Sequence, residues 1–181
     1  MHALFNSFFN YQAWANRAFF DALETLDRTQ HEAEHHQAIR LINHTHVVAQ
    51  IFAAHLLGRS HGYTSDNTAE TPELAELRSA VATSDQWYLD YVRSITPEQR
   101  CEKIAFSFTD GDKGYMTREE MLAHVTMHGG YHRGEIGRIL AQTSAQLPWD
   151  TFAVFLHQTQ PNRRLQDKLE FAPIPFQGAK N

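Results

Sequence analysis

The sequence predicts an all-α protein, a four-helix bundle with a small β-hairpin between its third and fourth long helices. Four long segments repeat apolar residues every three or four positions, which is the period of an amphipathic helix. Between the last two of these segments, a short stretch alternates apolar and polar residues ahead of an Asp-Gly pair, as hairpins do. Four amphipathic helices can bury their apolar faces against one another, so a bundle follows.

The first long helix is predicted over residues 3–26 and the second over residues 38–57. In the first, the apolar face comprises Leu4, Phe8, Tyr11, Ala15, Phe19, Ala22 and Leu26. A polar, histidine-rich stretch separates the two helices, and its HEAEHH segment at residues 31–36 is predicted to be a solvated loop. Gly58 is expected to end the second helix, because glycine commonly follows a helix C-terminus.

The third long helix is predicted to begin with Thr71 as N-cap and Pro72 as its first helical residue, and to run to about residue 95. Residues 101–116 then change period. In this stretch Ile104, Phe106 and Phe108 alternate with other residues before Asp110-Gly111. The stretch therefore predicts the hairpin.

Thr117 and Glu120 resemble a capping box that opens the fourth long helix, which is predicted to end near Gln142. A fifth, short helix is predicted over residues 149–158. From Pro161 the composition becomes polar, so we expect one domain over residues 1–160 and a C-terminal extension over residues 161–181.

Composition excludes several classes of protein. The 181 residues carry a net charge of −5, which argues against a nucleic-acid or anionic-membrane partner, since both require a basic surface. The sequence contains no run of about 18 apolar residues, so no transmembrane helix is predicted. No signal peptide is apparent, so a cytoplasmic location is expected. The single cysteine, Cys101, excludes an internal disulfide framework and a cysteine-based zinc finger.

Three histidines, His124, His128 and His132, follow one another at intervals of four residues. On a helical wheel, His128 and His132 lie within the apolar face. Burying imidazoles without partners costs several kcal/mol, and a shared metal ion supplies a partner. One ion cannot bind all three, because His124 and His132 are about 12 Å apart along the helix. The helical pair is therefore either His124 with His128 or His128 with His132.

The second helix offers a third ligand. His44 points to the core, between apolar neighbours on its helix. His55 shares that face but lies about 16 Å further along, which makes it a weaker candidate. His46 lies about 200° from His44 on the wheel and should face solvent or a neighbouring helix.

A stripe of small residues lies opposite the histidines and comprises Gly130, Gly134, Gly137 and Ala141. Each interior glycine costs about 1 kcal/mol relative to alanine. The stripe therefore predicts the close approach of another helix, either of the same bundle or of a second subunit. The alternative is that Gly129 makes room for a substrate.

Four segments resemble the DinB/YfiT-like family: NYQAWANRAFFDALETL at 10–26, LINHTHVVAQIF at 41–52, HVTMHGGYHRGEIGRIL at 124–140, and LPWDTFAVF at 147–155. The resemblance covers about residues 1–158. It implies a four-helix bundle that is often a homodimer, with a divalent metal ion held by three histidines. By this resemblance the metal ligands are His44, His128 and His132.

Three histidine ligands leave at least one coordination position open, whereas structural zinc sites normally have four protein ligands. Zinc and nickel both suit imidazole. The resemblance implies a metal-dependent transferase that joins a low-molecular-weight thiol to an electrophile, although no catalytic residue can be named. Two alternatives stay open: a non-catalytic, stress-related protein in which the metal is structural, and a metal-dependent hydrolase.

Overall fold

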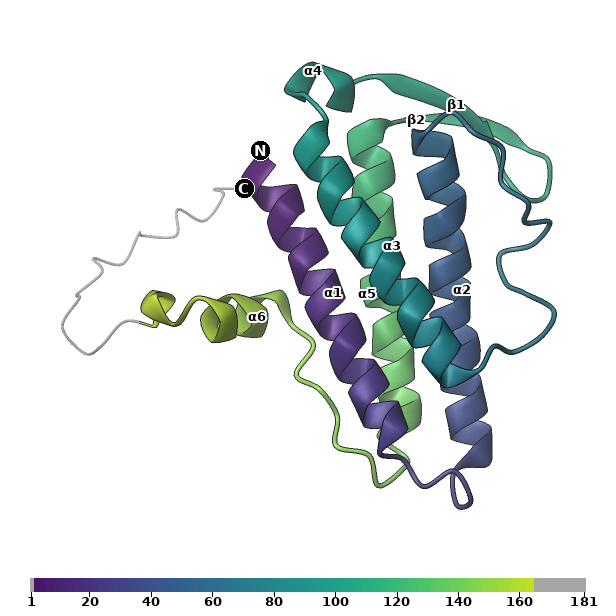
Figure 1. Ribbon diagram of the computed structural model, residues 1–181, viewed down its shortest axis with the longest axis vertical. Coiled ribbons are helices and arrows are strands. Elements are labelled where there is room, and N and C mark those ends of the chain that lie inside the picture. The colour runs from purple at the N-terminus through teal and green to yellow at the C-terminus, as the bar shows by residue number, and fades with distance from the viewer. Residues whose placement is uncertain (1, 165–181) are drawn as a thin grey trace, which may run out of the picture. The chain divides into compact units, whose positions relative to one another are not determined.

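The computed structural model describes residues 2–164 and confirms a four-helix bundle with a hairpin before its last long helix (Figure 1). The elements, in chain order, are α1 (His2–Glu24), α2 (Glu32–Leu56), α3 (Leu74–Ser94), α4 (Pro97–Arg100), β1 (Lys103–Ser107), β2 (Lys113–Thr117), α5 (Arg118–Leu140), α6 (Phe152–Thr159) and the 3-10 helix η1 (Pro161–Arg163). None of these helices combines the length and the apolar character that a membrane crossing requires.

The chain divides into two compact units, with the division between Asp150 and Thr151. The first unit contains the four long helices and the hairpin, and the second contains α6 and η1. The domain boundary expected near residue 160 stays a prediction. The C-terminal extension expected over residues 161–181 lies, beyond residue 164, outside the described residues.

Within the first unit, α1 packs chiefly against α3, and α2 against α5 (Figure 1). Two apolar clusters fill the space between them. Four of the seven residues predicted for the apolar face are buried, namely Ala15, Phe19, Ala22 and Leu26, whereas Leu4 is exposed. Phe9, Phe20 and Leu23, which the prediction did not include, are buried as well, so the buried face is wider than predicted. The reason is that α1 carries apolar residues around most of its circumference, and the period alone does not select the side that meets α3.

Two predicted helix starts were wrong. Helix α2 begins at Glu32 with His31 as its N-cap, so residues 32–36 are helical and do not form a loop. Glu32 and Glu34 lie in that first turn, where carboxylates interact favourably with the helix dipole, and His35 is buried. Helix α3 begins after Glu73, and its N-cap makes no side-chain hydrogen bond. The Thr71 hydroxyl oxygen instead lies 3.0 Å from Nε2 of His36 on α2, in hydrogen-bond contact with that ring.

The hairpin and the start of α5 follow the sequence pattern. Strands β1 and β2 pair antiparallel, with Lys103 opposite Thr117 and Ser107 opposite Lys113. The connecting turn contains Gly111 at a φ of +97°, a region that residues with a side chain rarely adopt. The predicted capping box of Thr117 and Glu120 is confirmed, so the second strand leads directly into α5.

The stripe of small residues has no close helix beside it within the described residues. Nothing in that part of the chain lies within 4 Å of a Cβ placed on Gly134, and the nearest atom to one on Gly137 is a Phe19 carbon at 4.0 Å. The close approach occurs at Gly129, where a Cβ would lie 3.1 Å from Gln12 Oε1 and 3.2 Å from an Arg133 nitrogen. A contact of the stripe with a second subunit stays a prediction.

These two environments predict opposite effects of adding one methyl group. Gly134→Ala should raise the free energy of unfolding by about 0.5–1 kcal/mol, because alanine favours the helix and meets no neighbour. Gly129→Ala should lower it by about 1 kcal/mol, because two buried side chains must move. Urea unfolding monitored by circular dichroism measures both. A destabilising Gly134→Ala would instead place that residue in a contact surface.

Candidate metal centre

Three imidazole nitrogens from two helices converge in the first unit. His44 extends from α2, and His128 and His132 from α5. His128 Nε2 lies 3.1 Å from His44 Nε2 and 3.1 Å from His132 Nε2, and the candidate ligand atoms all lie within 4.8 Å of one another. With metal–nitrogen bonds of about 2.0–2.1 Å, two nitrogens on a tetrahedral ion are about 3.4 Å apart. The spacing therefore suits one ion.

The fold separates these three histidines from the other candidates. The His124 ring lies 4.5 Å from the Phe52 ring and packs beside it, and the His55 ring lies 5.2 Å from the Phe106 ring. Neither belongs to the cluster that could bind a metal within the described residues. Of the two helical pairs that the spacing left open, the structure brings together His128 and His132.

Hydrogen bonds at the far side of two rings fix their tautomers. His44 Nδ1 lies 2.8 Å from the carbonyl oxygen of Asp66, and His132 Nδ1 lies 2.6 Å from a carboxylate oxygen of Glu135. Because both oxygens only accept, each Nδ1 carries the hydrogen and each Nε2 presents a lone pair. This arrangement is the usual environment of metal-binding histidines.

The lone pairs explain why a cation fits. His128 Nε2 faces two nitrogens that both present lone pairs, and it carries at most one hydrogen with which to satisfy them. A divalent ion would accept all three lone pairs at once. Burial, and then the neighbouring rings of His132 and His44, lower the pKa of His128 to about 3, so this ring is neutral, as a ligand must be.

Sequence analysis missed the two residues that orient the rings. Glu135 follows His132 by three positions on the same helix, so the helical repeat could have indicated it. Asp66 lies in the loop between α2 and α3, where no spacing rule connects it to His44. Its placement depends on how that loop returns along α2.

Glu135 provides a test of this arrangement. Glu135→Ala should weaken zinc binding by about 10–100-fold, because His132 loses the acceptor that holds its orientation and tautomer. Zinc competition with a chromogenic chelator measures the affinity. The control is Glu119→Ala, another carboxylate on α5 that lies in its first turn, which should bind zinc as the wild type does. Equal affinities of the two variants would contradict the assigned role of Glu135.

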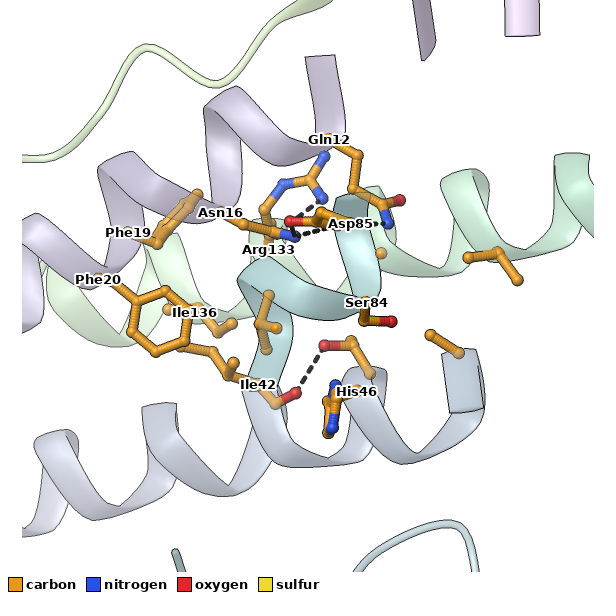
Figure 2. A pocket seen from close by; sticks show the side chains of 15 residues that line it. Gln12, Asn16, Phe19, Phe20, Ile42, His46, Ser84, Asp85, Arg133 and Ile136 are labelled. Atoms are coloured by element: carbon orange, nitrogen blue, oxygen red, sulfur yellow. Dashed lines mark hydrogen bonds between the residues drawn. The ribbon is translucent and has the colours of Figure 1, made fainter. Parts of the chain in front are cut away.

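A second polar cluster lies inside the bundle, and Figure 2 shows its side chains. His46, expected to face solvent or a neighbour, lines a cavity of about 30 Å³ together with Asp85 and Arg133. Asp85 accepts hydrogen bonds from Asn16 at 2.9 and 3.2 Å and from Gln12 at 3.4 Å. His46 therefore points into the bundle interior and not to solvent. Burial lowers the pKa of its imidazole.

Arg133 belongs to the same cluster and is ion-paired and buried. Its Nε donates to Asp150 at 2.8 Å, and the two side chains are only 4% and 13% exposed. Its guanidinium lies beside Gly129, where any side chain would meet it. The HGGYHRG segment thus has two roles on two faces of α5: His128 and His132 face the metal centre, while Gly129 and Arg133 face the buried cluster.

Asp85 makes stability depend on pH. Burial raises its pKa to about 6, above the ordinary value of 3.8, although hydrogen bonds from Asn16 and Gln12 act in the opposite direction. The folded state therefore binds a proton more readily than the unfolded state. Protonation of Asp85 therefore adds to the free energy of unfolding. This stabilisation is fully present below about pH 4 and is lost as the pH rises through about 6.

Asp85→Asn removes this titration. Between about pH 4 and pH 7, the free energy of unfolding of the wild type should fall by on the order of 2–3 kcal/mol relative to that of the variant. Urea unfolding of both proteins across this range measures the difference, in which contributions from the histidines cancel. A difference that does not change with pH would show that Asp85 ionises in its ordinary range.

Fold and site together define a four-helix-bundle protein with a candidate three-histidine metal centre. The DinB family matches residues 1–166 of the sequence, so the chain belongs to the DinB family. It is also similar to Protein DinB of Bacillus subtilis (strain 168), with 24% identity over 166 residues. That alignment covers 86% of this chain and 95% of the relative. The resemblance stated from the sequence is confirmed.

Proposed function

We propose that the chain binds one divalent metal ion, zinc or nickel, through His44, His128 and His132, and that it is a transferase acting with a low-molecular-weight thiol. The observation that supports it most is the convergence of three Nε2 atoms beside a cavity. Three protein ligands leave a position for a substrate atom, which a closed structural site would not.

The residues of the chain have defined tasks in this proposal. A bound ion would lower the pKa of a thiol that reaches the open position. The Asp66 carbonyl and Glu135 hold two of the rings in place, and the cavity receives the electrophile. The thiol sulfur would form a bond to the electrophilic carbon while the leaving group departs with its bonding electrons. The thiol proton would pass to solvent.

A metal-dependent hydrolase is the second candidate. Asp66 favours it, because this residue lines the cavity and its Oδ2 lies 3.7 Å from His44 Nδ1. A carboxylate there could accept a proton from an attacking water. The third candidate, a structural ion, would only tie α2 to α5.

One set of assays separates the three candidates. Zinc- or nickel-loaded protein is given 1-chloro-2,4-dinitrobenzene with cysteine or glutathione, and separately 4-nitrophenyl acetate without thiol. His132→Ala and chelator-treated protein are the controls. Thiol-dependent chloride displacement that requires the metal supports the transferase, and ester hydrolysis without thiol supports the hydrolase. Absence of both, with a lower melting temperature after metal removal, supports the structural ion.

We also propose that the chain forms a homodimer. Met127 and Tyr131 support this proposal, because both are large, exposed residues on α5 and lie one turn apart, near the exposed Gly134. Analytical ultracentrifugation of the wild type and of Tyr131→Glu tests it. A wild type that sediments as a monomer would contradict the proposal.

A further inference from the structure

A cavity of about 250 Å³ lies directly beside the candidate metal centre. His44 and His128 form part of its wall, so a molecule inside it would contact the centre. The remaining wall comes from α2, α5, the loop that contains Asp66 and the end of the hairpin around Phe108. This cavity is separate from the smaller one in Figure 2, which lies in the bundle interior.

Aromatic rings dominate the wall. The Phe106 ring centre lies 6.0 Å from that of Phe52 and 5.2 Å from that of His55. Phe108 continues the series, with its ring centre 4.8 Å from that of Phe106. Rings at these spacings and inclined to one another offer both faces and edges to a further ring.

Phe108 is the exposed end of this series. Its side chain is 51% exposed, and its ring lies over Gly114 on the opposite strand, where a Cβ would come within 3.3 Å of it. The absence of a side chain at residue 114 therefore lets Phe108 lie across the hairpin. The ring is available to contact a ligand without being needed in the buried core.

The charge of the wall selects the kind of ligand. Among the described residues, no lysine or arginine lines the cavity, and Asp66 is the one carboxylate in its wall. An anionic group would find no cationic side chain among these residues and would be repelled by Asp66, so its only favourable charge contact would be with an ion held by His44 and His128. For comparison, an apolar cavity of about 150 Å³ is large enough to hold benzene. The space beside the centre therefore accommodates a substituted ring or two fused rings.

We propose that this cavity binds an uncharged aromatic group, which makes an uncharged aromatic compound the class of the second substrate. The assignment as a substrate site rests on the proposed function, while the binding of aromatic compounds is tested separately. The ring would lie against Phe106 and Phe108, with its reactive end toward His44 and His128.

The test compares two ligands of nearly equal size, 2-naphthalenemethanol and 2-naphthoate, by calorimetric titration of the full-length protein. Both zinc-loaded and chelator-treated protein are used, because the latter removes direct carboxylate–metal contact. The neutral alcohol should bind at least about 10-fold more tightly than the anion to the chelator-treated protein. If the chelator-treated protein binds the two ligands equally, or binds naphthoate more tightly than the alcohol, the proposal is overturned.

Two variants locate the binding site. Phe108→Ala should weaken binding of the alcohol by about 3–10-fold, as expected from the loss of one aromatic contact. Tyr115→Ala, which removes an exposed aromatic residue from the other strand and does not line the cavity, should leave binding unchanged. Melting temperatures establish that both variants are folded. Binding that is indifferent to Phe108, or lost equally in both variants, would overturn the proposal.

The metal content of the same samples distinguishes this proposal from the proposed function. A protein that takes up no metal but binds the alcohol through Phe108 would refute the metal-dependent transferase and support the aromatic site. A protein that takes up one equivalent of metal but does not bind the alcohol would refute the aromatic site alone.

Discussion

Replacing His128 by alanine is expected to abolish stoichiometric metal binding. His128 Nε2 is the atom within 3.1 Å of both other ligand nitrogens, so its loss leaves one ligand on each of two helices. The affinity should fall by more than about 100-fold, which exceeds the usual effect of losing a residue that only orients a ligand. Zinc in excess should no longer raise the melting temperature, since that stabilisation depends on binding to the folded state.

Metal content by mass spectrometry and thermal unfolding with and without zinc are the measurements. His44→Ala and His132→Ala should behave in the same way. His124→Ala, one turn away but packed beside Phe52, should retain the metal. His36→Ala removes an exposed histidine of α2 that lies outside the metal centre, and as a control it should bind metal as the wild type does. Full retention of metal by His128→Ala would mean that these histidines are ordinary core residues.

Arg133→Met is expected to cause the largest loss of stability. The substitution keeps most of the side-chain volume but removes the only positive charge hydrogen-bonded to Asp150 among the described residues. Asp85, also buried, loses a favourable interaction with the same guanidinium. Removing one partner of a buried ion pair typically costs about 3–5 kcal/mol, because the other charge stays buried. We expect the free energy of unfolding of Arg133→Met to be about 3 kcal/mol lower than that of the wild type.

Urea unfolding at neutral pH measures this loss. Arg133→Met combined with Asp150→Asn should recover part of it, because the second change removes the unpaired charge. Arg78→Met is the matched control, because Arg78 pairs with Asp21 and Glu24 at the surface and should cost less than about 1 kcal/mol. A cost at Arg133 no greater than that at Arg78 would show that the buried cluster adds no net stability.

The sequence was most informative where local chemistry decides the structure. Four helices followed from apolar repeats, and the hairpin from alternation and Asp110-Gly111. The start of α5 followed from Thr117 and Glu120, which form their capping box within one turn. The starts of α2 and α3 were predicted wrongly. Polar residues at a helix start resemble a loop, and Thr71-Pro72 suited a cap that the chain does not use.

The sequence by itself determined that an imidazole pair on the last long helix and His44 on the second helix lie toward the core, and the family resemblance selected His44, His128 and His132 as the ligands. Only the tertiary structure brought the three imidazoles within ligand distance of one another, placed Asp66 and Glu135 against two of the rings, and turned His46 toward the buried cavity that Asp85 also lines. The physical reason is that a helical repeat fixes positions on one helix. Rotation and axial displacement between α2 and α5 instead depend on packing along their whole length, and the course of the 57–73 loop depends on the helices it connects.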